Sequence, residues 1–394
     1  MTEKKAKPQI RFAGFSDTWE QRKLGDIFKY EQPQAYIVES TEYDDRFQIP
    51  VLTAGQSFVL GYTDEDFGIK NASPRNPVVI FDDFTTSSHY VDFPFKIKSS
   101  AMKLLSLVNG KDDIHCAYNV LQNIGYEPVS HERHWISTFA KFNVYMPQNS
   151  AEQKCIGDYF ANLDNLITLH QRKLDKLTNV KKSMLEKMFP KNGANVPEIR
   201  FKGFTAPWEQ RKFSEGVSEI GDGLHGTPIY CEDGNVYFIN GNNLVDGKIV
   251  ISAETKKVNE SQQSTADKSL DDTTILMSIN GTIGNLAYYS GERLMLGKSA
   301  AYIKVSEFDK RFVYAYLQAP SVQGYFMDSL TGTTIKNLGL KAIREMIMFI
   351  PQDVDEQKRI GKFFDYLDHL ITLHQRKLEK LKNIKKACLE KMFI

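Results

Sequence analysis

The chain has 394 residues, 41% of them hydrophobic, which is more than one hydrophobic core commonly serves and predicts at least two globular domains. Its 50 Lys and Arg residues balance 49 Asp and Glu residues, so it lacks the strong basic excess of many small nucleic-acid-binding domains. It has no apolar signal segment and no run of about 18 apolar residues, so we expect a cytoplasmic protein with no membrane span.

The sequence contains an internal repeat. The lead-in Pro8–Lys23 (PQIRFAGFSDTWEQRK) returns as Pro197–Lys212 (PEIRFKGFTAPWEQRK), and the long segment Pro147–Phe189 returns as Pro351–Phe393. A repeat constrains architecture more than any local propensity does. We therefore predict four parts: residues 1–146 and 191–350 as globular domains with their lead-ins, and residues 147–190 and 351–394 as long helices.

The first divergent region, Leu24–Met146, carries a β-branched run at residues 78–81 that predicts a buried strand. A polar loop and a Lys-Ser pair follow it. The side chains that could offer hydrogen bonds to DNA bases or phosphates in this region are Thr85, Thr86, Ser87, Ser88, His89, Lys98, Arg133 and His134.

The two long segments predict helices that pack as a coiled coil. Asn149 with Glu152, and Asp353 with Glu356, have the spacing typical of a helix start. Apolar residues then recur every three or four positions, interrupted at matching places by a histidine and a lysine. The predicted packing residues are Leu163, Ile167, Leu174 and Leu177 in the first segment and Leu367, Ile371, Leu378 and Leu381 in the second.

The second divergent region, Phe213–Ile350, has strand-like runs at residues 237–239, 274–277 and 301–305. Both regions follow one plan of strand, polar loop and Lys-Ser, with Lys98 and Lys298 in matching positions, so we expect one fold with two different loops and an α+β class. The candidate DNA contacts of the second region are Asn240, Asn242, Asn280, Thr282, Lys298, Thr333, Thr334, Lys336 and Asn337. A β-turn role is an open alternative for each of them.

Both divergent regions are acidic, which counts against strong unassisted DNA binding. Residues 24–145 hold 10 basic and 16 acidic residues, and residues 213–349 hold 12 and 16. Because phosphate neutralisation dominates DNA affinity, such regions need a partner that supplies positive charge. We find no catalytic constellation, and the four widely spaced cysteines predict neither a metal site nor a disulfide framework.

Four motifs carry a resemblance to a known family: WEQRK at the end of both lead-ins, LITLHQRKL in both long segments, and SINGTIGNLAYY and GTTIKNLGLK in the second region. With these motifs the chain resembles the specificity subunits of Type I restriction-modification systems. The resemblance implies two mixed α/β target-recognition domains separated by two long antiparallel coiled-coil helices, with an internal pseudo-two-fold repeat. It also implies a non-catalytic chain that reads a bipartite, interrupted target in double-stranded DNA.

The same resemblance implies partners and assigns cofactors to them. Two modification subunits would bind S-adenosylmethionine and methylate adenine, and restriction subunits would use ATP and Mg, so we expect no cofactor in this chain. A different class of function stays open from the residues alone: a coiled-coil scaffold whose globular domains bind proteins. An enzyme is the third and weakest alternative. The repeated segments are predicted helices, and they contain no cluster of His, Cys or carboxylate side chains that could be catalytic.

Overall fold

The computed structural model describes residues 7–53, 58–126, 133–191, 193–333 and 336–394. The chain divides into two compact units, residues 1–171 with 376–394 and residues 172–375, so each unit contains part of both long helices. Within the described ranges, none of the helices has the length and apolarity that a membrane span requires. The predicted α+β class with two globular regions and two long helices is confirmed.

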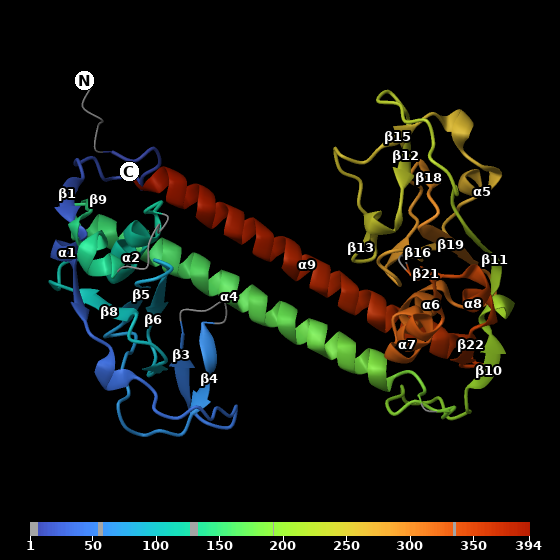
Figure 1. Cartoon of the computed structure of the whole chain (residues 1–394), viewed down its shortest axis with the longest axis horizontal. Helices are drawn as coiled ribbons and strands as arrows, with labels where there is room; N and C mark the ends of the chain where they lie inside the picture. Colours follow the sequence, from blue (N-terminus) through green and yellow to red (C-terminus); the bar gives the residue numbers. More distant parts are fainter. Residues whose placement is uncertain (1–6, 54–57, 127–132, 192, 334–335) are drawn as a thin grey trace. The chain divides into compact units, whose positions relative to one another are not determined.

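The described residues of the first globular region form nine short strands and three short α-helices, most of which Figure 1 labels. Its strands are β1 (Glu20–Lys23), β2 (Phe28–Glu31), β3 (Ile49–Leu52), β4 (Val59–Thr63), β5 (Val78–Asp82), β6 (Ser88–Val91), β7 (Lys96–Ile97), β8 (Met102–Leu107) and β9 (Asn143–Met146). Its helices are α1 (Leu24–Ile27), α2 (Ile114–Gln122) and α3 (His134–Ser137), with short 3-10 turns at Gln34–Tyr36 and Phe139–Lys141.

The second globular region has more strands, several of them of two residues. They are β10 (Glu209–Lys212), β11 (Val217–Asp222), β12 (Val236–Ile239), β13 (Leu244–Val245), β14 (Lys248–Ile249), β15 (Lys257–Val258), β16 (Thr274–Ser278), β17 (Leu286–Tyr288), β18 (Leu294–Leu296), β19 (Ala300–Val305), β20 (Leu330–Thr331), β21 (Asn337–Leu338) and β22 (Ile347–Ile350). The helices are α5 (Thr265–Lys268), α6 (Lys310–Leu317), α7 (Pro320–Asp328) and α8 (Leu340–Glu345), with 3-10 turns at Phe213–Glu215, Gly241–Asn243 and Glu260–Gln262.

The two regions share one sheet topology. The four-stranded sheet β2-β8-β5-β6 of the first corresponds to β11-β19-β16-β17 of the second, and the three-stranded sheet β4-β3-β7 corresponds to β15-β12-β18. Each three-stranded sheet contains one parallel pair, β3 with β7 and β12 with β18. The central strands β5 and β16 are buried along their whole length, as their β-branched and apolar residues require. The expectation of one fold with two loop sets is confirmed.

The repeated long segments form α4 (Ser150–Lys187) and α9 (Val354–Met392). Asn149 and Asp353 cap them, because each side-chain oxygen accepts from the backbone N–H two residues later, at 2.8 Å. In the first unit the beginning of α4 packs against the end of α9, and Leu163 and Leu381 belong to one apolar cluster. In the second unit Leu177 and Leu367 share a cluster, so the two helices run antiparallel in each unit.

The carboxylates three residues after the caps lie at the helix starts that their spacing predicts, and they also bind the lead-ins. Glu152 and Glu356 are buried, and each binds the arginine of a lead-in segment, Arg11 or Arg200. A carboxylate in the interior is costly unless it is paired, and here the lead-in supplies the paired cation.

The packing residues predicted on the helices are all buried or half-buried. Beside them, Leu166 and Leu169 on α4 are exposed, as is Leu373 on α9. Leu185 and Val180 of α4 pack into the apolar cluster of the second unit. Leu166, Leu169 and Leu373 are thus apolar helix residues that the units leave exposed beside the predicted packing residues.

Candidate nucleic-acid interface

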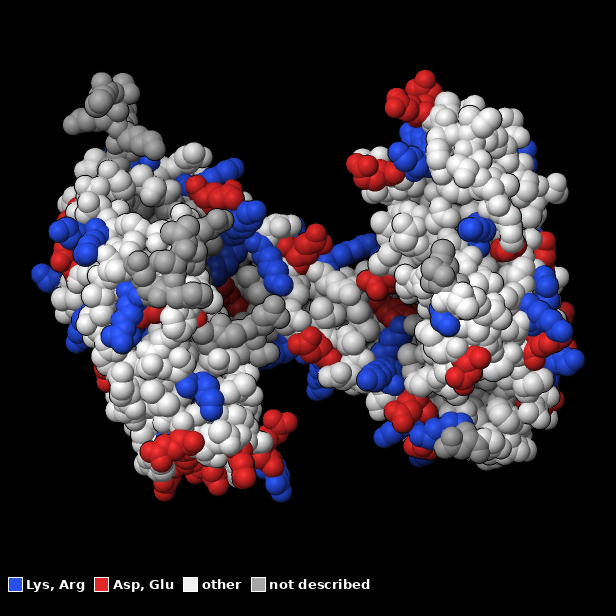
Figure 2. All heavy atoms as spheres, viewed as in Figure 1, with Lys and Arg blue, Asp and Glu red and all other residues white. Residues whose placement is uncertain are grey.

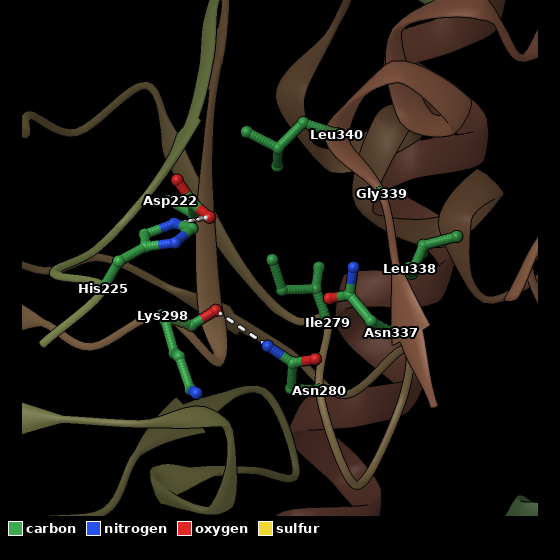
Figure 3. Close-up of a pocket in the computed structure, with 9 residues that line it drawn as sticks. All are labelled: Asp222, His225, Ile279, Asn280, Lys298, Asn337, Leu338, Gly339 and Leu340. Atoms are coloured by element: carbon green, nitrogen blue, oxygen red, sulfur yellow. Dashed lines mark hydrogen bonds and ion pairs between the residues drawn. The ribbon is translucent and has the colours of Figure 1, made fainter. Parts of the chain in front are cut away.

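The second globular region has a surface hollow of about 240 Å³ that collects polar side chains from distant parts of its sequence (Figure 3). Asp222 ends β11, Asn280 follows β16, Lys298 lies between β18 and β19, and Asn337 lies in β21. The remaining lining residues are His225, Ile279, Leu338, Gly339 and Leu340. The hollow therefore gathers strand ends and loops of the framework that the two regions share.

The hollow offers both donors and acceptors. His225 Nε2 lies 2.7 Å from Asp222 Oδ2, and the Asn280 amide donates to the carbonyl of Lys298 at 3.1 Å (Figure 3). The Lys298 side chain is exposed, and its ammonium group has no hydrogen-bond or ionic partner among the residues that the structure describes. A carboxylate next to amides and a cation suits the edge of a base pair, whose groups alternate in polarity, better than a phosphate, which a carboxylate repels.

Residues Asn280 and Asn337 hold the floor of this hollow together. They form an isolated antiparallel bridge, and the backbone N–H of Leu338 donates to the carbonyl of Ile279 at 2.9 Å. Gly281 adopts a φ of +73°, a conformation that only glycine adopts without strain. Thr282 and Thr333 are exposed near these strands, and Thr334 lies outside the described residues.

The corresponding loop of the first region is the hairpin between β5 and β6. Asp82 accepts from the backbone of Phe84 and from the Thr85 hydroxyl, and Thr85 and Ser87 share a hydrogen bond. Thr86 adopts a φ of +57°, an uncommon conformation for a β-branched residue that is compatible with a site held for function. Three of the candidates from this region, Thr85 to Ser87, therefore lie together in one tight turn, directly before β6.

His89 is the fifth candidate in this hairpin. Its ring stacks on Phe58, with 4.1 Å between the ring centroids, and burial lowers the pKa of His89 below the ordinary histidine value. Both effects favour a neutral imidazole in a packed position. Ser88 lies in β6 itself, paired with Phe81.

Lys98 and Lys298 do not occupy equivalent positions, contrary to the sequence match. The backbone N–H of Lys98 donates to Leu52, and the matching bond in the second region comes from Gly297 to Ile239. Lys298 therefore lies one residue further along its loop. Lys98 donates to the Tyr43 hydroxyl at 2.9 Å, whereas Lys298 lines the hollow, so the two lysines have different surroundings.

Arg133 and Lys336 are exposed basic residues close to segments that are anchored beside the central strands. Arg133 lies two positions before Trp135, whose backbone N–H donates to the side-chain carboxylate of Asp83, one residue after β5. Lys336 lies two positions before Leu338, whose backbone N–H donates to the backbone carbonyl of Ile279, one residue after β16. Each region thus carries a cation near such an anchored segment, although the two anchoring bonds differ in their acceptors.

Two other candidates have structural roles. His134 is 1% exposed and contacts the Tyr126 ring, so the structure places it in the interior and not on a surface open to DNA. Asn240 caps the 3-10 turn at Gly241–Asn243 and accepts from the Ser299 hydroxyl, which is the turn role that stayed open for it. Asn242, in the same turn, is exposed.

Sequence reasoning missed Asp222 and His225. They lie in the stretch GDGLHGT, where a carboxylate and a histidine alternate with glycines directly after a strand, and that pattern was the available signal. Nothing in the linear sequence places this stretch beside Asn280 or Asn337. Among the described residues, no group of three or more His, Cys, Asp or Glu side chains is arranged to hold a metal ion.

A family model described as the Type I restriction modification DNA specificity domain matches residues 16–179 and again residues 208–383. The chain belongs to this family. The two matches cover both globular regions and most of both helices, and they reproduce the internal repeat seen in the sequence.

Relatives support the same assignment for this specificity-subunit chain. It is 29% identical over 366 residues to the Type I restriction enzyme EcoR124I/EcoR124II specificity subunit of Escherichia coli, a match that covers 88% of this chain and 86% of that protein. It is 24% identical over 257 residues to the putative type I restriction enzyme MjaX specificity subunit of Methanocaldococcus jannaschii, covering 60% and 55%. The crystal structure of the S subunit from M. genitalium matches with a TM-score of 0.67 at 15% identity, over 98% of this chain and 99% of that one, and shows the shared fold.

Proposed function

We propose that this specificity subunit reads a bipartite, interrupted target in double-stranded DNA, with one half-site for each globular region. The observation that carries the proposal is that the two regions share one sheet topology but carry different loops at equivalent strand ends. A shared framework gives both regions the same approach to a duplex, and different loops give each its own sequence preference.

In the second region we assign the reading of bases to the polar hollow. Asp222 can accept a hydrogen bond from an exocyclic amine, and the free ammonium of Lys298 can donate to a guanine edge or to a phosphate. In the first region we assign the reading of bases to the turn Thr85–Ser87 and the adjoining Ser88. We assign the exposed Arg133 and Lys336 to backbone phosphates, contacts that would position the loops without specifying sequence.

The chain acts, we propose, within an assembly and carries out no chemistry itself. Two modification subunits would supply adenine methylation with S-adenosylmethionine, and restriction subunits would supply ATP- and Mg-dependent cleavage. The charge of the chain supports a need for such partners. Figure 2 shows acidic side chains gathered at one end of the first globular region, and both regions carry more acidic than basic residues.

The test is to map N6-methyladenine in the genome of cells that express the chain with its modification partner. We expect methylation at one bipartite sequence, and replacement of residues 213–346 by the recognition region of another family member should change one half-site and leave the other unaltered. A protein-binding scaffold predicts that the exchange leaves the methylated sequence unchanged, and that result would refute target reading by these regions.

A further inference from the structure

Each unit contains the same polar network at the junction of its two long helices and its globular region. In the second unit Lys181 Nζ lies 2.5 Å from Asp368 Oδ1 and donates to Gln318 Oε1 at 2.7 Å. In the first unit Lys385 Nζ lies 2.7 Å from Asp164 Oδ1 and 3.5 Å from Gln122 Oε1. The two lysines are the matching polar interruptions of the apolar seam.

The glutamines extend each network into the globular region. Gln122 follows Tyr118 by four residues on α2, and its amide nitrogen donates to the Tyr118 hydroxyl at 2.6 Å. Gln318 follows Tyr314 by four residues, and its amide nitrogen donates to the Tyr314 carbonyl at 3.0 Å. In both networks the amide nitrogen is occupied, so its carbonyl oxygen turns to the lysine.

The tyrosines lead on to the strands that follow the candidate reading loops. Tyr314 stacks on Tyr288 of β17 with 4.1 Å between ring centroids, and Tyr118 lies 6.1 Å from Tyr90 of β6. Strands β6 and β17 leave the hairpin turns that carry Thr85–Ser87 and Gly281–Thr282. A continuous set of contacts therefore joins the long helices to the loops in each unit.

The other end of α2 and α6 is tied to the long helices as well. Gln153 of α4 accepts from the backbone N–H of Asp113, at the start of α2, and Gln357 of α9 accepts from that of Asp309, at the start of α6. Gly157 of α4 packs closely on the start of α2, since a Cβ there would lie 2.0 Å from Asp113 Oδ1, the oxygen that accepts from the Cys116 N–H. Each of these short helices is thus held at both ends.

These networks select one packing register of the long helices more than they add to the free energy of folding. The carboxylates are about a third or more exposed, Asp368 at 33% and Asp164 at 39%, so each ion pair adds little to the free energy of folding. An apolar seam of repeated leucines accepts more than one register, whereas a lysine that must meet a carboxylate and an amide accepts one.

We propose that the Lys181–Asp368–Gln318 and Lys385–Asp164–Gln122 networks are positioning elements that fix each reading loop in one orientation on the helices. They thereby hold the spacer between the half-sites to a single length. This inference rests on the proposed function, and these residues act through the loops without touching DNA.

The experiment compares charge reversals in the second-unit network by methylation mapping of the full chain co-expressed with its modification partner. Lys181→Asp and Asp368→Lys each place like charges together, and we expect each to reduce methylation at the native site roughly tenfold and to add sites with an altered spacer. The double variant restores an opposite-charge pair and is expected to recover the native spacer and at least about a third of the methylation.

Lys154→Asp is the matched control, because Lys154 lies on the same helix in an exposed pair with Asp158 and is expected to change neither spacer nor rate. If the charge reversal prevents assembly, Lys181→Met replaces it as the test variant, because it keeps the apolar part of the side chain and removes the ammonium donor. The longer contact to Gln122 than to Gln318 further predicts a smaller effect of Gln122→Leu than of Gln318→Leu.

Single variants with the native spacer and rate would overturn the inference, and so would a double variant no better than either single one. Its failure is distinguishable from failure of the proposed function. A wild-type complex that methylates no specific sequence refutes target reading itself. A wild-type complex with one bipartite site that Lys181→Asp and Lys181→Met leave unaltered refutes only the positioning role.

Discussion

Arg11 binds Glu152 through two hydrogen bonds of 2.5 and 2.7 Å, and the Glu152 side chain is only 1% exposed. The repeat reproduces this bidentate pair as Arg200 with Glu356, at 2.6 and 2.7 Å. In both copies the lead-in tryptophan, Trp19 or Trp208, directs its indole N–H at the same carboxylate. The lead-ins are therefore fastened to the start of a long helix by a buried charge.

We predict that Glu152→Gln destabilises the first unit by about 3 kcal/mol, because the substitution leaves the mostly buried Arg11 guanidinium without its counter-charge. Glu356→Gln should destabilise the second unit by a similar amount. Chemical denaturation of the assembled protein measures both. Glu209→Gln, at an exposed carboxylate 3.9 Å from its arginine, is the control and should have little effect.

Lys298 and Lys336 should contact DNA. If they bind phosphates, alanine at either position weakens binding to all sequences alike and lowers the slope of log K against log salt by about one. If Lys298 binds a base instead, its substitution relaxes specificity at one position. Binding of target and non-target duplexes by the assembled complex at several salt concentrations distinguishes these results, and unchanged affinity and specificity for both variants would remove the lysines from the interface.

Asp222→Asn should relax one base position of the half-site read by the second region. An aspartate accepts from a cytosine amine, whereas an asparagine both donates and accepts, so discrimination at that position should fall about tenfold or more. Methylation mapping shows it as a degenerate position. Asp233→Asn, on an exposed turn of the same region, is the control. Equal discrimination in both variants would exclude Asp222 from base reading.

The long helices are expected to set the spacer length. Four residues inserted both between Gln171 and Arg172 and between Gln375 and Arg376 add about 6 Å and about one turn to each helix. The first insertion lies between Leu163, which packs in the first unit, and Leu177, which packs in the second. The spacer should lengthen by one or two base pairs, since base pairs rise about 3.4 Å, with both half-sites unchanged.

An equal insertion after the exposed Gly193, in the connector between the repeats, provides the comparison and should leave the spacer as it is. If the helix insertions give a functional complex with the original spacer, the helices do not determine the distance between half-sites.

The purified chain alone should be poorly soluble or bind DNA weakly, because Leu166 and Leu169 on α4 are 43% and 46% exposed and both globular regions are acidic. Co-expression with the modification partner should correct both properties. Leu166→Lys with Leu169→Glu should raise the solubility of the isolated chain and weaken its co-purification with that partner. An isolated wild-type monomer with nanomolar affinity for one duplex at physiological salt would contradict this expectation.

The architecture was readable from the sequence because it is repeated and periodic. The segments Pro147–Phe189 and Pro351–Phe393 are identical at 29 of 43 positions. Their shared apolar period of three and four has one simple solution, a long helix with one packed face. The β-branched runs at residues 78–81 and 274–277 became the central strands β5 and β16 for the same local reason.

The candidate site depended on contacts that no local pattern contains. Asp222 and Asn337 are 115 positions apart in the sequence and line one hollow, because β11 and β21 end at the same place in the fold. The match of Lys98 with Lys298 was wrong by one residue, since a loop can change length without changing the strands that bound it. Local propensity and periodicity determine helices, strands and their repeat, whereas only the tertiary structure decides which loop residues meet and whether a charge such as Glu152 faces a partner or solvent.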